Sequence, residues 1–71
     1  MNNTLTSGAR RLAEARTLKR LERDIPVVER DIMWLQRYGN MRAALDTKDL
    51  LADMRAAARY LREKEQEGGH E

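Results

Sequence analysis

The sequence predicts an all-α protein in which a long, kinked helix folds back on a shorter antiparallel helix to form a helical hairpin. Apolar residues recur from Leu18 to Leu35 at alternating spacings of three and four, which is the coiled-coil pattern. The composition is rich in Ala, Leu, Arg and Glu, residue types that favour helix over strand. A single Gly–Asn pair, Gly39–Asn40, separates the two apolar segments.

The first helix is predicted over residues 7–38. Pro26 removes a backbone donor and crowds the preceding turn, yet the apolar phase continues across it. We therefore expect one continuous helix that is kinked near Pro26. The alternative is a break at Asp24–Ile25, with Pro26 in the first turn of a new helix. Three hydroxyl side chains could cap the first amides: Thr4, Thr6 and Ser7.

The second helix is predicted over residues 47–66. Gly39–Asn40 ends the first helix because both residue types tolerate the left-handed conformation of a helix C-terminus. Residues 41–45 then form a connection, and Asp46 or Thr47 caps the second helix. Gly68–Gly69 stops it, which predicts a disordered tail over residues 67–71.

The apolar seam is expected to form the hairpin core and, in part, a dimer interface. Antiparallel pairing from the turn places Met54 beside Ile32 and Leu61 beside Ile25. The unequal helix lengths leave residues 5–17 without a partner in the chain. A single hairpin also leaves half of its apolar seam exposed to solvent. We therefore expect a homodimer, a four-helix bundle. The seam comprises Leu18, Leu21, Ile25, Val28, Ile32, Leu35, Leu50, Met54 and Leu61.

The positive charge of the chain is concentrated in its first third. Residues 1–23 hold six Arg or Lys against two Glu, whereas the whole chain has a net charge of +2. Arginines also recur at every seventh residue opposite the seam, close to two of the three aromatic residues. Because Trp, Tyr and Arg are enriched at binding hot spots, the predicted partner-binding residues are Arg16, Arg23, Arg30, Trp34, Arg37 and Tyr38. The alternative for Trp34 is burial in the homodimer interface.

No catalytic, cofactor or metal-binding residue is predicted, so we expect a protein that is not an enzyme. There is no Cys, and the one His, His70, lies in a Gly-rich tail without a second ligand placed by spacing. A helix-turn-helix is disfavoured because the second predicted helix begins with acidic residues that phosphate would repel. No apolar run is long enough to cross a bilayer, so the default is a soluble, cytoplasmic protein with no membrane partner.

In size, composition and expected architecture, the chain resembles small phage- or prophage-encoded helical inhibitors of host regulators. Anti-activators of quorum-sensing transcription factors are one example. The resemblance covers the whole chain but no diagnostic motif, so it transfers no functional residue. It implies a small accessory protein that binds and modulates, most simply inhibits, a partner protein. The alternatives are a nucleic-acid-binding transcriptional regulator that uses the basic first helix, and a structural or assembly component.

Overall fold

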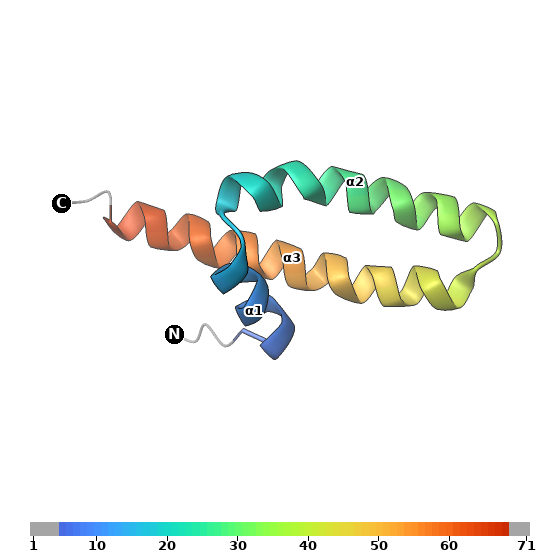
Figure 1. Ribbon diagram of the computed structural model, residues 1–71, viewed down its shortest axis with the longest axis horizontal. Helices are drawn as coiled ribbons and strands as arrows, with labels where there is room; N and C mark the ends of the chain where they lie inside the picture. The colour runs from blue at the N-terminus through green and yellow to red at the C-terminus, as the bar shows by residue number, and fades with distance from the viewer. Residues whose placement is uncertain (1–4, 69–71) are drawn as a thin grey trace.

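The computed structural model describes residues 5–68, and this part of the chain is all-α, as predicted (Figure 1). It contains three helices: α1 (Ser7–Ala15), α2 (Leu18–Arg37) and α3 (Met41–Gly68). Helices α2 and α3 form an antiparallel hairpin, and α1 packs against α3 on the side drawn opposite α2 in Figure 1. The molecule is elongated, with extents of 49 × 22 × 18 Å.

The first helix does not run unbroken from residue 7 to residue 38, and this prediction was wrong. Arg16 (φ −131°, ψ 152°) and Thr17 (φ −81°, ψ 160°) are extended and separate α1 from α2. The Thr17 hydroxyl accepts a hydrogen bond from the Arg20 amide at 3.1 Å, which caps α2. The Arg16 amide donates to the Leu12 carbonyl at 2.9 Å and completes α1. We call residues 16 and 17 the elbow.

Helix α2 continues through Pro26, so the expected continuity there is correct and the alternative break at Asp24–Ile25 is not. Pro26 is exposed, while Ile25 and Val28 on either side of it pack against the core. The proline therefore costs one helical hydrogen bond, on the solvent-exposed face of α2. Packing of the apolar face holds the helix together across the gap.

The connection between α2 and α3 is shorter than predicted. Gly39 has φ +79°, and its amide donates to the Gln36 carbonyl while the Asn40 amide donates to the Leu35 carbonyl. This pair of bonds is the Schellman arrangement that ends a helix. The Asn40 side chain then accepts from the Ala43 amide at 3.2 Å, so Asn40 caps the next helix directly.

Helix α3 consequently begins at Met41 rather than at residue 47, and neither Asp46 nor Thr47 is its cap. The Thr47 hydroxyl donates to the Ala43 carbonyl at 2.8 Å, a bond made inside a helix rather than at its start. The helix also extends beyond residue 66 and includes Glu67 and Gly68. The rest of the predicted tail, residues 69–71, and the candidate cap Thr4 lie outside the described residues.

Residues 5–17 do have a partner within the chain, contrary to the prediction. Thr6 caps α1 by accepting from the Ala9 amide at 3.1 Å, and its hydroxyl donates to Asp53 of α3 at 2.8 Å. Ala9 is fully buried. A Cβ at Gly8 would lie 2.2 Å from an Asp53 carboxylate oxygen, so glycine allows the close approach of α1 to α3.

The core lies where the three helices meet. Leu21, Met54 and Ala57 are fully buried, and Ala58 nearly so. Among the predicted seam residues, Ile32 is buried, whereas Leu50 is 43% exposed and its neighbour Leu51 is 7% exposed. Leu50 is therefore not a core residue, and the adjacent Leu51 is the one that α3 buries. The remaining seam residues are half-buried: Leu18, Ile25, Val28, Leu35 and Leu61.

Two ion pairs across the hairpin show the register of α2 against α3. Arg55 pairs with Glu29, and Arg62 pairs with Glu22. The second pair therefore lies seven residues from the first on both helices. This register is within two residues of the predicted pairing of Met54 with Ile32 and Leu61 with Ile25. Because these side chains are exposed, the two pairs add little to the stability of the hairpin.

Leu21→Ala should lower the free energy of unfolding by ~2–5 kcal/mol, because it opens a cavity among fully buried side chains. Leu50→Ala, the matched control, should change it by less than ~1 kcal/mol at a protein concentration that keeps the chain monomeric, since Leu50 is largely exposed in the single chain. Urea denaturation followed by circular dichroism measures both. Equal losses from the two variants would contradict the placement of the core.

Thr17→Ala should destabilise the protein by about 1 kcal/mol, because it removes the cap of α2. In an unbroken helix the same change would instead stabilise by up to ~0.7 kcal/mol through helix propensity. The control is Thr17→Ser, which keeps the hydroxyl and should restore most of the stability. A thermal melt that shows Thr17→Ala more stable than the parent protein would rule out the elbow.

Pro26→Ala should stabilise the protein, by up to ~3 kcal/mol, because it restores an amide that can donate to the Glu22 carbonyl within α2. The denaturation midpoint should rise with no change in the denaturant slope. A lower midpoint would show that α2 ends at this residue.

Candidate functional site

The six predicted partner-binding residues are all exposed, but the structure does not bring them into one site. Arg16 and Arg23 lie at the elbow, whereas Trp34, Arg37 and Tyr38 lie in the last turns of α2. Eleven residues separate Arg23 from Trp34, which is about 16 Å along a helix. The predicted site is therefore two surfaces, one at each end of α2.

An aromatic stack lies at the end of α2. The rings of Trp34 and Tyr38 are four residues apart, and their centroids are 5.2 Å apart with an interplanar angle of 18°. Both side chains remain open to solvent, with Trp34 52% and Tyr38 72% exposed. The stack uses the i, i+4 neighbour relation of a helix, so α2 itself holds both rings in place.

Further large apolar side chains are exposed close to the same turn. They are Met33 on α2 and Met41 and Leu45 on α3. Together with Trp34 and Tyr38 we call these residues the turn-end surface. Sequence reasoning missed Met41 and Leu45 because it placed residues 41–45 in a connection. Their i, i+4 spacing next to a possible Asn cap was the signal for a helix starting there.

The arginines predicted to line α2 divide into two kinds. Arg30 and Arg37 are exposed, and neither lies within ion-pair distance of a carboxylate among residues 5–68. They lie within four residues of Trp34 on the chain. The turn-end surface thus combines exposed aromatic and apolar groups with neighbouring uncompensated cations.

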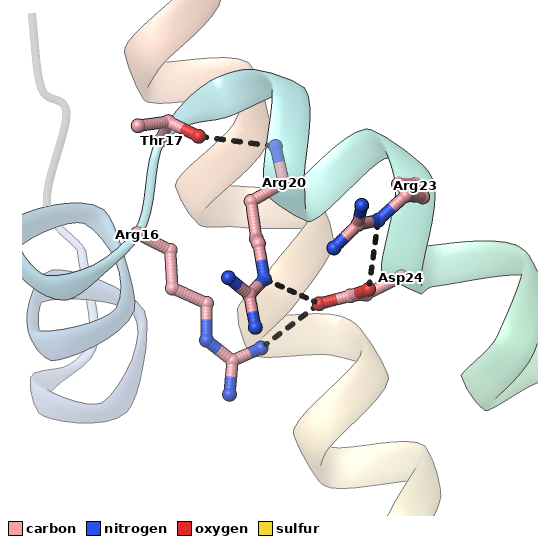
Figure 2. Close-up of polar contacts among 5 residues, drawn as sticks. All are labelled: Arg16, Thr17, Arg20, Arg23 and Asp24. Carbon is pink, nitrogen blue, oxygen red and sulfur yellow. Dashed lines mark hydrogen bonds and ion pairs between the residues drawn. The ribbon is translucent and has the colours of Figure 1, made fainter.

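The elbow gathers the other arginines around one acid. Arg16, Arg20 and Arg23 lie 3.7, 3.8 and 3.8 Å from the carboxylate of Asp24 (Figure 2). Arg20 was not among the predicted site residues, since it lies outside the seven-residue repeat. Arg16 leaves that repeat because the chain is extended at the elbow.

The described residues offer no centre for metal chemistry. Within residues 5–68, no three His, Cys, Asp or Glu side chains gather in an arrangement that would hold a metal ion. None of the helices in that range is both long enough and apolar enough to cross a bilayer. His70 lies outside the described part of the chain.

Comparison with known proteins gives no family. The sequence matches no protein-family model, and neither a curated protein nor a solved structure is significantly similar to it.

Trp34 should fluoresce at long wavelength and be readily quenched by iodide in dilute solution, because about half of its surface is open. Its spectrum should be followed from nanomolar to tens of micromolar protein, alongside sedimentation equilibrium. A blue shift that tracks dimer formation would place Trp34 in a homodimer interface. An unchanged spectrum across dimerisation would leave it free for another partner. A blue-shifted, protected Trp34 in the monomer would contradict the exposed stack.

Proposed function

We propose that this chain is a small non-enzymatic binding protein that attaches to a partner protein through the turn-end surface and modulates, most simply inhibits, that partner. The main support is the exposed stack of Trp34 on Tyr38 with Arg30 and Arg37 nearby. Trp, Tyr and Arg dominate the energetics of protein interfaces. A phage accessory protein acting on a host regulator, such as an anti-activator, is the biological role we favour.

The geometry of the turn-end surface suits tight binding at low entropic cost. Stacking already restricts both rings in the free protein, so little side-chain freedom remains to be lost on association. The surface lies at one end of an elongated hairpin, on two regular helices joined by the tight Gly39–Asn40 turn. Such a tip fits into a concave surface on a partner and would block whatever else binds there. Inhibition by occlusion needs no catalytic group.

Self-association into a homodimer, as a four-helix bundle, is a further part of this proposal. The first segment does not support a dimer, because α1 packs on α3. Support comes from apolar exposure on both helices of the hairpin, from Val27 on α2 to Leu50 on α3. A second copy could cover these side chains while the ends of the hairpin stay accessible.

The proposal predicts that Trp34→Ala combined with Arg30→Ala abolishes capture of the partner. Loss of one hot-spot contact costs at least ~2 kcal/mol, or roughly thirtyfold in affinity. The tagged protein would be used to capture partners, with nuclease present, from the cells that encode it. Mass spectrometry would identify what the parent protein retains, and purified partner would then be titrated by calorimetry.

The matched control is Gln66→Ala with Arg59→Ala, which removes one exposed uncharged side chain and one exposed arginine from α3. It should bind like the parent protein. Circular dichroism should show the same helicity for all three proteins. Equal binding by the Trp34/Arg30 variant and the parent would remove the turn-end surface as the contact. Equal losses in both variants would show that the contact is spread over the chain.

A further inference from the structure

The elbow concentrates positive charge that its one carboxylate does not neutralise. Three guanidinium groups, those of Arg16, Arg20 and Arg23, converge on Asp24 (Figure 2). Lys19 lines the same hollow as Arg20 and Arg23. Four cations against one anion leave a local charge of +3. Glu22, the acid that lies between Arg20 and Arg23 in the sequence, is paired with Arg62 of α3 and does not offset this charge.

Asp24 orients these arginines without consuming their hydrogen-bonding capacity. Each guanidinium has five N–H donors in a rigid fork, and each approaches Asp24 with one nitrogen within ion-pair distance. All three arginines are exposed, so their other donors face solvent. The arrangement leaves several directed donors free to bind an anion.

The charge also lies where it opposes local helix stability. Lys19 and Arg20 fall in the first turn of α2, which contains no acidic residue. Cations at this end of a helix are unfavourable because the helix dipole is positive there. A bound anion would reverse the sign of that interaction. The dipole and the side chains would then act on the same ligand.

The lining of the elbow distinguishes among anionic partners. A hollow of about 400 Å³ is lined by Thr17, Lys19, Arg20 and Arg23, with no large apolar side chain among them. Protein interfaces have an apolar or aromatic centre, and helices that lie on membranes insert Trp, Phe or Leu. The apolar part of the wall comes from the carbon atoms of these four residues themselves and not from Trp, Phe or Leu. Arginine forks in such a hollow match the geometry of phosphate oxygens.

We infer that the basic cluster at the elbow, formed by Arg16, Lys19, Arg20 and Arg23, binds the phosphate backbone of nucleic acid without reading its bases. Contacts of this kind position a protein on a polyanion and carry no sequence information. The site is separate from the turn-end surface and does not depend on the function proposed for it. It also differs from a uniformly basic first helix, because the elbow is what brings Arg16 to Arg20 and Arg23.

The test is fluorescence anisotropy of a fluorescein-labelled 20-base-pair random duplex DNA, titrated with the full chain at salt concentrations from ~50 to ~200 mM. Four phosphate contacts predict a slope of log affinity against log salt of about −3.6. Arg20→Gln with Arg23→Gln should weaken binding at low salt at least tenfold and reduce the slope to about −1.8. The control, Arg42→Gln with Arg59→Gln, removes the same charge elsewhere and should leave the slope unchanged.

Three further probes separate the partner classes: the single strand of the same sequence, a polyglutamate peptide and phosphatidylserine vesicles. Binding to either DNA form, with the loss confined to the elbow variant, supports the inference. No binding to either form at low salt would overturn it, and so would equal losses in the elbow and control variants. Stronger binding to polyglutamate or to vesicles would assign the elbow to an acidic protein or to a lipid surface instead.

Discussion

The hydrogen bond from the Arg20 amide to the Thr17 hydroxyl marks the point on which the rest of this structure depends. This bond caps α2, which begins after the two residues that follow the end of α1. Those two extended residues, the elbow, let α1 reach α3. Once there, α1 buries Ala9 and anchors itself through the bond from Thr6 to Asp53. The same elbow brings the first arginines of α2 together with Arg16. The local cap at Thr17 thus determines both the packing of α1 against α3 and the arginine cluster around Asp24.

Much of the fold follows from periodicity, and the main error came from reading periodicity over too short a segment. The seam from Leu18 to Leu35 correctly predicted a helix that continues through Pro26, because the apolar phase is unbroken there. Extended backwards by the same spacing, the seam meets Glu14 and Arg11, both charged. The apolar residues of α1 follow a different phase, one that contains Ala9 and Leu12. That change of phase, just before the hydroxyl side chain of Thr17, was the sequence signal for the elbow.

The start of α3 depends on local signals that the sequence contains, because the Schellman turn at Gly39 leaves Asn40 in position to cap the next helix. Other features depend on tertiary contacts and could not be predicted. Leu50 and Leu51 are adjacent apolar residues, and packing decides which is buried. The candidate site was predicted as a row of arginines and two aromatic residues on one helix. The residues are exposed as expected, but eleven residues of α2, about 16 Å of helix, separate Arg23 from Trp34. They therefore form two surfaces with different chemistry. The aromatic end suits a protein partner and the cationic end a phosphate backbone.

Helix α1 folds onto α3 beside Asp53, and nuclear Overhauser effects between Gly8 and Asp53 protons test this arrangement most directly. If residues 7–38 formed one continuous helix, Asp53 would lie opposite Ile32 of that helix. Gly8 would then be 24 residues away along the first helix, about 36 Å at 1.5 Å per residue. The elbow instead puts a Gly8 Cβ position within 3.1 Å of the Asp53 Cγ atom. An isotope-filtered spectrum of the unmodified protein should therefore show intramolecular contacts between these two residues. Their absence from a spectrum that resolves both residues, or their appearance only between chains, would contradict this account.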